Sequence, residues 1–528
     1  MKSVSLFVCL LCLSSLSAEE HFDQTHPEFW NDMMREELRR ATILSPIVKR
    51  ADNVILFIGD GMGITTTTAA RWLKGQRNNK TGEEGFLTFE RFPYVAMSKT
   101  YSVDSQTTDS AATATALLSG VKNNYGCVGV DGRVQYDDCE TSHGKHVDSV
   151  LHWALAEGKS VGIVTTTRVT HATPAAAYAH SASRNWENDF DIQNVYGNCT
   201  DIARQLIEDN PNIQVILGGG RSKFMTDNQT DPETGRVSSR ARKDGRDLIQ
   251  AWLDEKEARG VSHHYVWNAS AFDDVDTQTT DYLLGLFSDT HMKYELERKD
   301  GPTPTEAGEP SIAEMTLKAI EILRRNKNGY FLLVEGGRID HGHHLNWANL
   351  ALSDTVALDD AVTVAATETS QEDTLIVVSA DHSHVFNIAG YPQRGNPVLG
   401  AAGTGSDMLP YTSLVYGNGP GYGRRNITND ELDHRYYKQQ SAVPIDTETH
   451  GGEDVAIYGR GPMAHLFHGV HEQAYIAHVI GYSACIGPYK EPAACALALV
   501  PAPPISAGTT LKYGSVVALL SVIGAYLL

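Results

Sequence analysis

Positively charged residues are scarce in this sequence. Its 528 residues contain 44 Lys and Arg against 65 Asp and Glu, which gives a formal net charge of −21 at pH 7. A protein that grips a nucleic-acid backbone needs clustered Lys and Arg, so this balance argues against nucleic acid as a partner. A small phosphorylated substrate stays compatible with it, because one site can be locally positive in an acidic protein.

Long hydrophobic runs are also missing, and the two that come closest lie at the chain ends. The run 6–13 is too short to span a bilayer and is followed by small residues, which predicts a secretory signal peptide over residues 1–18. Near the other end, Ser506 begins a triplet of small residues, and an apolar tail closes the chain. This order resembles a GPI-attachment signal, with Ser506 as attachment residue and 507–528 as the removed propeptide, although a flexible apolar tail is the alternative. The expected location is the extracellular face of the cell membrane.

Cysteine is sparse as well. Seven are present, and Cys9 and Cys12 lie in the expected signal peptide, so five remain and at least one is unpaired or pairs between chains. We expect a local disulfide Cys485–Cys495 around a Gly-Pro loop and a long-range disulfide Cys139–Cys199, which leaves Cys127 free. Five N-x-S/T sequons, at Asn79, Asn198, Asn228, Asn268 and Asn426, suggest that several carry glycan in a secreted chain.

Apolar runs alternating with helical stretches indicate the fold class. The expected buried strands are 53–58, 160–164, 213–217, 330–334 and 374–378, and the expected helices between them are 147–157, 201–208 and 312–325. This alternation predicts an α/β fold with a large, mostly parallel central sheet sandwiched between helices, over one domain of residues 19–500.

Three further segments have their own character. Residues 21–42 are amphipathic and predict a helix that packs either on its own domain or on a second subunit. Residues 227–247 are polar and rich in turn residues, which predicts a surface excursion. Residues 390–437 are rich in Gly, Pro, Asn and Tyr and predict a loop-rich insertion rather than sheet.

A helix start with a serine at its first turn stands at 107–120. Asp109 or Ser110 can cap the helix, Ala and Leu carry it, and Gly120 can end it. The N–H groups and the dipole at a helix N-terminus favour an anion, which would suit a serine attacking a phosphoryl group. Serine at a helix cap is common, so this segment alone does not establish a nucleophile.

Acidic and histidine side chains follow several of the expected strands. Asp60 ends the first; Glu335, Asp340 and His344 follow the strand at 330–334; and Asp381 with His382 follow the strand at 374–378. In open α/β sheets the ligand site lies outside the carboxyl ends of the strands. Acids gathered there are costly unless something neutralises them, and divalent cations do so. A solvated histidine surface or a helix-capping Asp would explain each motif alone; together they favour a metal site.

These motifs resemble those of alkaline phosphatases and stand in the same order. They are residues 58–63, 109–111, 170–174, 334–344, 379–384 and 449–453. The likeness covers nearly the whole chain and is greatest to the secreted, GPI-anchored animal members, of the tissue-nonspecific or intestinal type. It implies hydrolysis of small phosphate monoesters through a phosphoserine intermediate, by a homodimer.

The resemblance also implies a role for each matching residue. Ser110 matches the nucleophile and Arg184 the phosphate-binding arginine. Asp340, His344 and His450 match a first zinc site; Asp60, Ser110, Asp381 and His382 match a second; Asp60, Thr173 and Glu335 match a magnesium site; and His171 and His384 match positions that support the ligands. Glu233, Phe287, Ser288 and Glu309 match a calcium site, although Ser288 replaces a Glu common in vertebrate members. The 390–437 insertion resembles the family's crown domain in shorter form.

Two other readings compete with this one. A sulfatase would need Cys or Ser in a C/S-x-P-x-R context, which Ser110 lacks, and related phosphodiesterases usually carry a Thr nucleophile and lack an equivalent of Arg184. A non-catalytic, metal-stabilised surface glycoprotein would be favoured by a missing ligand, yet every expected ligand position is filled.

Overall fold

The computed structural model describes residues 24–300 and 308–491, and the chain forms two compact units, residues 1–46 and 47–528. The predicted signal peptide, Cys495 and Ser506 therefore lie outside the described residues. In the first unit, helix α1 runs over Pro27–Ile43, later than the 21–42 expected, because Pro27 occupies the first helical turn, where proline is favoured. None of its residues is buried, and Trp30, Met33, Met34 and Leu38 are exposed.

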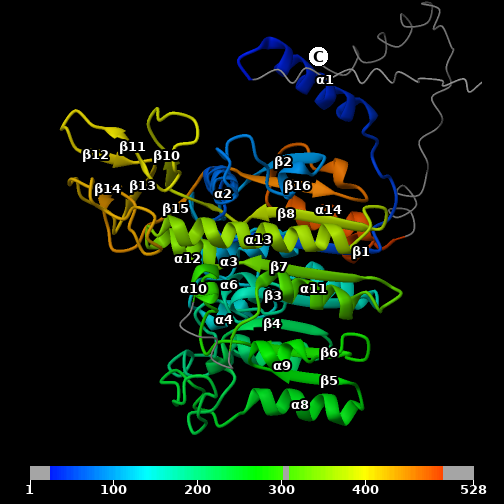
Figure 1. Ribbon diagram of the computed structural model, residues 1–528. Coiled ribbons are helices and arrows are strands. Elements are labelled where there is room, and N and C mark those ends of the chain that lie inside the picture. The colour runs from blue at the N-terminus through cyan, green and yellow to red at the C-terminus, as the bar shows by residue number, and fades with distance from the viewer. Residues whose placement is uncertain (1–23, 301–307, 492–528) are drawn as a thin grey trace, which may run out of the picture. The chain divides into compact units, whose positions relative to one another are not determined.

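The second unit is built on a ten-stranded sheet, which confirms the predicted fold class (Figure 1). Its strands, in spatial order, are β17 (Gly469–Glu472), β2 (Tyr94–Lys99), β16 (Val455–Arg460), β8 (Thr374–Ala380), β1 (Asn53–Gly59), β7 (Tyr330–Gly336), β3 (Ser160–Arg168), β4 (Val215–Gly219), β6 (Tyr282–Leu286) and β5 (His263–Val266). Only β16 runs antiparallel to its neighbours in this sheet. The five strands expected from apolar runs are β1, β3, β4, β7 and β8.

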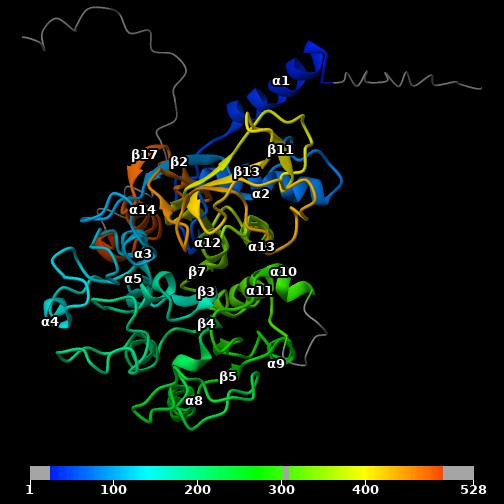
Figure 2. The same ribbon diagram turned by 90° about the vertical axis from the view of Figure 1, so that its left-hand side faces the viewer.

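Helices cover both faces of this sheet. They are α2 (Ile64–Arg77), α3 (Ser110–Ser119), α4 (Cys139–Ser142), α5 (Val150–Ala156), α6 (Ala172–Ala175), α7 (Ile202–Arg204), α8 (Leu248–Arg259), α9 (Ala269–Asp273), α10 (Glu295–Asp300), α11 (Ile312–Leu323), α12 (Arg338–His344), α13 (Ala348–Glu368) and α14 (Tyr475–Ala484). Short turns of other helix types are η1 (Phe89–Arg91), η2 (Gln205–Asp209, π), η3 (Arg221–Lys223), η4 (Ala464–Leu466) and η5 (Gly487–Tyr489). Figure 2 shows α3 and α5 on one side of β3 and β7, with α11 and α13 on the other.

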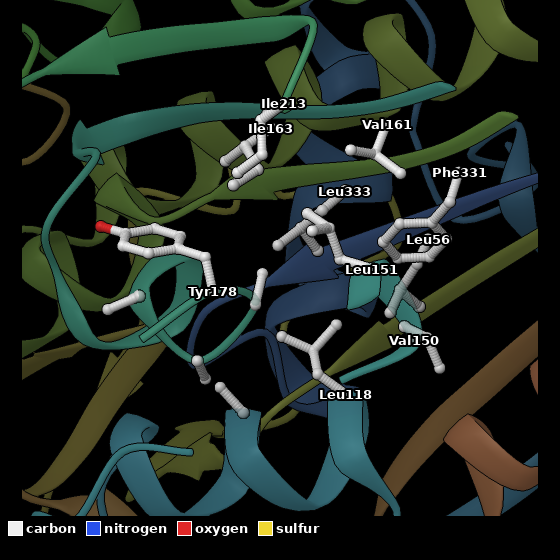
Figure 3. Close-up of a cluster of buried hydrophobic side chains, with 14 of the residues drawn as sticks. Leu56, Leu118, Val150, Leu151, Val161, Ile163, Tyr178, Ile213, Phe331 and Leu333 are labelled. Carbon is white, nitrogen blue, oxygen red and sulfur yellow. The ribbon is translucent and has the colours of Figure 1, made fainter. Parts of the chain in front are cut away.

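Alternating strand residues build two separate hydrophobic cores, one on each face of the sheet. Leu56 of β1 and Phe331 and Leu333 of β7 pack with residues of α3 and α5 (Figure 3). Their neighbours Ile55 and Leu332 belong to the other core, with α2, α11 and α13. Because both faces are covered, these strands are apolar at nearly every position, which is why they could be recognised as continuous runs.

The expectation of loops without sheet in residues 390–437 is wrong. Strands β11 (Ala401–Thr404), β12 (Pro410–Thr412) and β13 (Leu414–Gly419) lie there, and β13 joins β10 (Phe386–Ile388) and β14 (Ser441–Pro444) in a three-stranded sheet. These strands are three to six residues long, which is too short for a hydrophobic period to stand out among Gly and Pro. A two-residue pairing joins β9 (Ser383–His384) to β15 (His450–Gly451).

The described cysteines include both bonded and free thiols, and the sequon residues differ in exposure. A disulfide joins Cys139 to Cys199, Cys127 is a buried free thiol, and Cys485 is disulfide-bonded. Of the sequon residues, Asn79, Asn198, Asn228 and Asn426 are exposed, whereas Asn268 is half-buried and caps α9 by accepting the N–H of Ala271. In the described part of the chain, no helix combines the length and the apolar character needed to cross a membrane.

Candidate active site

The central strands β8, β1, β7 and β3 deliver polar side chains to one edge of the sheet. Gly59 of β1 is paired with Gly336 of β7 and Ala380 of β8, so Asp60 and Asp381 leave neighbouring strands at the same level. Glu335 sits one residue earlier on β7, opposite Thr165 of β3. All four of these side chains are fully buried. The edge is the carboxyl end of the parallel strands, where the sequence predicted the site.

Helix α3 presents Ser110 to this edge from its first turn. Asp109 is the N-cap and accepts the N–H of Ala112, and Gly120 ends the helix in the left-handed region at φ 73°. The Oγ of Ser110 lies 3.3 Å from Asp60 Oδ1 and 3.3 Å from His382 Nε2. The serine is therefore held against two of the candidate ligands at the positive end of a helix.

One cluster surrounds the carboxylate of Asp340. Its Oδ1 lies 2.9 Å from Nε2 of His384, 3.3 Å from Nε2 of His344 and 3.3 Å from Nε2 of His450. Asp340 and His344 lie four residues apart on α12, as the sequence predicted. Burial opposes ionisation of Asp340, but the imidazoles around it hold its pKa well below the ordinary range.

Backbone and carboxylate acceptors fix the orientation of these imidazoles. Nδ1 of His344 donates to the Glu448 carbonyl at 2.6 Å, and Nδ1 of His450 donates to the Thr108 carbonyl at 2.7 Å. Both rings thus turn Nε2 toward Asp340, the arrangement by which proteins hold metal-binding histidines. Nδ1 of His384 is likewise 2.5 Å from Glu448 Oε2. Glu448 was missed from the sequence, and its only signal is its place two residues before His450.

A second cluster joins Asp60, Asp381 and His382. Nε2 of His382 lies 3.4 Å from Asp60 Oδ1 and 3.3 Å from Asp381 Oδ2, and its ring stacks on that of His450 at 3.5 Å. Asp381 also accepts the N–H of Gly61 at 3.0 Å. Burial, together with the neighbouring acids, raises the pKa of Asp60 well above its usual value and raises that of Asp381.

A third group lies between β3, α6 and β7. Glu335 accepts hydrogen bonds from Thr165 and Thr167, and burial raises its pKa to about 7. Its other oxygen, the hydroxyl of Thr173 and Nδ1 of His171 are buried without a hydrogen-bond partner among the described residues. Buried polar atoms are normally paired, so this gathering fits a bound cation and its water shell.

Arg184 connects the serine helix to this third group. Its Nη1 donates to Asp109 at 3.0 Å and its Nη2 lies 3.0 Å from His171 Nε2. Burial and the neighbouring guanidinium groups lower the pKa of His171 well below its usual value, so the ring is neutral and can accept from Arg184. One fifth of the arginine side chain is exposed, which leaves it accessible to an anion above Ser110.

The residues expected to form a calcium site lie elsewhere. Glu233 pairs with Arg221 at 2.9 Å and lies 3.9 Å from Lys293. Glu309 accepts the N–H of Lys293, while its other oxygen is buried without a hydrogen-bond partner in the described structure. Phe287 is buried, and the Ser288 carbonyl accepts two backbone N–H groups. Burial raises the pKa of Glu309 to about 7.

Fold and site together define a class: an α/β enzyme whose serine lies among side chains able to hold metal ions. Several such groups occur at this edge, including Asp340 with His382, His384 and His450, and Asp60 with His171 and Glu335. The chain belongs to the alkaline phosphatase family, since the family model described as "Alkaline phosphatase" matches residues 51–486.

Individual relatives agree with this assignment. The tissue-nonspecific alkaline phosphatase of Gallus gallus is 50% identical over 504 residues, which cover 93% of this chain and 95% of that one. The tissue-nonspecific isozyme of Homo sapiens is 49% identical over 489 residues, or 90% of this chain and 91% of that one. The crystal structure of Thermus thermophilus alkaline phosphatase, at 24% identity, shares the fold with a TM-score of 0.59 over 83% of this chain and 92% of that one.

Proposed function

We propose that this protein hydrolyses phosphate monoesters to an alcohol and inorganic phosphate through a phosphoserine at Ser110. The observation that supports this proposal is the position of the Ser110 Oγ, which lies 3.3 Å from both Asp60 and His382 at the start of α3. The alkoxide of Ser110 would attack phosphorus in line with the leaving oxygen, and water would then hydrolyse the phosphoserine.

The donor set suits two zinc ions and one magnesium ion. Asp340, His344 and His450 would hold the first zinc; Asp60, Ser110, Asp381 and His382 the second; and Asp60, Thr173 and Glu335 the magnesium. Imidazole with carboxylate is the usual zinc environment, and oxygen donors alone suit magnesium. When bound, such ions stabilise the negative charge that develops on the attacking and leaving oxygens. Calcium at Glu233, Phe287, Ser288 and Glu309 is a weaker proposal, because Arg221 and Lys293 already neutralise Glu233.

Protein side chains bind and orient the phosphate. Asp109 serves two purposes, because one of its oxygens caps α3 while the other holds Nη1 of Arg184. The guanidinium is thereby fixed beside Ser110, where its N–H groups can pair with two phosphate oxygens. His171 fixes the other side of the same guanidinium.

Substitution of the serine tests the proposal. Ser110→Ala should lower kcat by at least about 1,000-fold, because loss of a nucleophile typically lowers kcat by that much or more. The matched control is Ser119→Ala at the far end of α3, whose hydroxyl only donates to the Thr115 carbonyl. Near wild-type turnover in a folded, zinc-loaded Ser110→Ala protein would remove Ser110 from the reaction.

A diesterase is the second candidate, and substrate comparison separates the two. Rates on a phosphate monoester and on the matching diester, with and without chelator, should show chelator-sensitive monoester hydrolysis. Preference for the diester would favour the diesterase, and no turnover of either would favour a surface glycoprotein.

We further propose that the mature chain is held on the outer cell surface by a GPI anchor at Ser506. The supporting feature is the small-residue triplet followed by the apolar tail. Treatment of membranes with a GPI-specific phospholipase C should release the activity. Activity that stays in the membrane fraction after complete treatment would exclude this anchor.

We also propose a homodimer in which α1 packs on the partner subunit. The helix buries none of its residues, and it exposes Trp30, Met33, Met34 and Leu38. Exposed apolar side chains of this size mark interaction surfaces. Light scattering at micromolar concentration should give the dimer mass, and a monomer would contradict the assignment.

A further inference from the structure

A histidine cluster without an assigned role surrounds the start of α5. Asp148 and His152 flank the N-cap residue Ser149, and His180 follows α6 on a neighbouring segment. One potential ligand atom from each of Asp148, His152 and His180 lies within 4.8 Å of the others. His146 stacks on His180 with ring centroids 4.4 Å apart and planes within 8°. None of these residues belongs to the proposed catalytic metal sites.

Hydrogen bonds to oxygen acceptors fix one nitrogen on each of the two half-buried imidazoles. Nδ1 of His180 donates to the Gly129 carbonyl at 2.6 Å, so Nε2 carries the lone pair. Nε2 of His152 donates to Asn210 Oδ1 at 3.1 Å. The amide of Asn210 is oriented by its own donation to the carbonyls of Tyr178 and Gln205.

The remaining nitrogen of His152 is weakly engaged. Its Nδ1 meets only long contacts from Ser149, 3.4 Å from the backbone N and 3.5 Å from Oγ. A ring whose one nitrogen is fixed by a carbonyl or amide oxygen while the other keeps its lone pair is how proteins prepare a histidine for metal. Both His152 and His180 have this form.

The charge around the cluster also suits a cation. Asp148 is exposed and makes no ion pair within the part of the chain that the structure describes. Metal binds histidine in its neutral form, and the carboxylate of Asp148 supplies a negative charge beside the two rings.

We propose that Asp148, His152 and His180 hold a zinc ion outside the active site. Two imidazoles and one carboxylate form a donor set that zinc prefers, and three protein ligands leave the fourth tetrahedral position to water. The ion would tie the start of α5 to the segment that follows α6. That segment pairs with its neighbour through Val128 and Ser181, so the ion would stabilise the fold where these segments meet.

Zinc counting on the holoenzyme tests this site. The full chain is dialysed against buffered zinc with magnesium present, and bound zinc is measured by elemental analysis alongside kcat and the melting temperature. Wild type should bind one zinc per chain more than Asp148→Asn or His152→Gln, and its melting temperature should rise with zinc in the range that fills this extra site. The kcat of both variants should match wild type, because neither residue touches the active site.

His264→Gln is the matched control, because His264 is exposed on the edge strand β5 and is not one of the three proposed ligands. It should bind as much zinc as wild type. The proposal is overturned if wild type binds no zinc beyond the amount that activity requires, or if both variants keep the extra ion. Because the readout is the zinc in excess of the activity-linked ions, failure here leaves the active-site proposal standing, and loss of activity in Ser110→Ala leaves this one standing.

Discussion

The strand ends of β1, β7 and β8 and the segment from Asp201 to Asp244 both bury charged side chains, but only the segment pairs its buried acid with a fully buried arginine. Arg242 is fully buried and binds Asp201 through two parallel hydrogen bonds of 2.9 Å, while its Nη2 reaches Asp244 at 2.6 Å. Although burial favours the neutral acid, hydrogen bonds from Arg242 hold the pKa of Asp244 below its ordinary value. This segment therefore pairs its acids with an arginine of its own.

The sheet edge at the candidate active site has the opposite balance of charge. Asp60, Asp340, Asp381 and Glu335 are buried together, and among them the pKa of Asp60 and Asp381 is raised by burial and by the neighbouring acids. Arg184 is near, but its ion pair is with Asp109. Asp60 and Asp381 have no lysine or arginine partner within the described residues, and buried acids of this kind are unstable alone and gain when metal binds. The segment around Arg242 is thus built for structure, and the strand ends are suited to take ions.

Metal removal should therefore show the largest difference between the two regions, because only the strand ends are expected to bind metal. Exhaustive zinc chelation should abolish activity and lower the melting temperature, because a ligand at a thousandfold excess over its dissociation constant stabilises by about 4 kcal/mol. Zinc should restore most of the activity and magnesium should raise it further, while magnesium alone should fail because it suits imidazole ligands poorly. Full activity in protein shown by elemental analysis to lack zinc would end the two-zinc assignment.

Breaking the self-neutralised region should affect stability and leave chemistry intact. Arg242→Met leaves the buried Asp201 without its cation, and loss of one partner of a buried pair costs about 3–5 kcal/mol. Urea unfolding should show this loss, while kcat of the folded protein stays at the wild-type value. The exposed Arg236 of the same segment gives the control, Arg236→Met, which should change the unfolding free energy by less than about 0.5 kcal/mol. A fall in kcat would mean that the two regions are coupled.

Glu448→Gln tests whether a carboxylate behind the candidate metal ligands contributes to metal binding. The carboxylate of Glu448 binds Nδ1 of His384 and the N–H of Val385, and together with Asp340 it raises the pKa of His384 to about 10 against the effect of burial. Loss of such a support for metal ligands typically costs about 10–100-fold in metal affinity or activity. Activity measured against zinc concentration should shift to higher zinc and recover at saturation. Exposed Glu431→Gln is the control, and an unchanged zinc dependence in Glu448→Gln would show that the carboxylate has no such role.

Much of this organisation could be predicted from sequence because it depends on local signals. Strands buried on both faces leave continuous apolar runs, and Asp109 and Gly120 mark the two ends of α3 as expected for a cap and a left-handed terminus. The side chains at the ends of β1, β7 and β8 could be placed together because parallel strands end at a common edge.

Other features depend on contacts between distant residues and leave no local pattern. The polar segment 227–247 was expected to run over the surface, and most of it does. Arg242 is nevertheless fully buried, because it pairs with Asp201, which lies 41 residues earlier in the chain. Strand β16 inserts antiparallel between β2 and β8, from near the end of the chain. Glu448 supports His384 from 64 residues away, and the stacked pair of His146 and His180 forms only when two segments meet.

Asp354 on α13 offers the most direct test, because it is a buried acid without an arginine ion pair within the described residues. It is 4% exposed, and its Oδ2 accepts the N–H of Glu295 at 3.1 Å. Burial raises its pKa from 3.8 to about 8, against a smaller opposing effect of Arg338. An acid whose folded-state pKa is raised gives stability that is complete below its unfolded pKa and is lost as pH rises toward the folded pKa. Wild type should therefore lose stability between pH 4 and pH 8 from this group.

Asp354→Asn cannot ionise, and its amide oxygen can still accept from Glu295. The variant should gain stability relative to wild type as pH rises, by on the order of 4 kcal/mol more at pH 9 than at pH 5. Urea unfolding of both proteins at the two pH values measures this double difference, in which all other titrating groups cancel. Asp360→Asn, one helical turn and a half along α13 and exposed at 52% of its side chain, is the comparison and should show a smaller pH-dependent gain. An equal gain for Asp354→Asn at both pH values would mean that the folded protein keeps this carboxylate ionised.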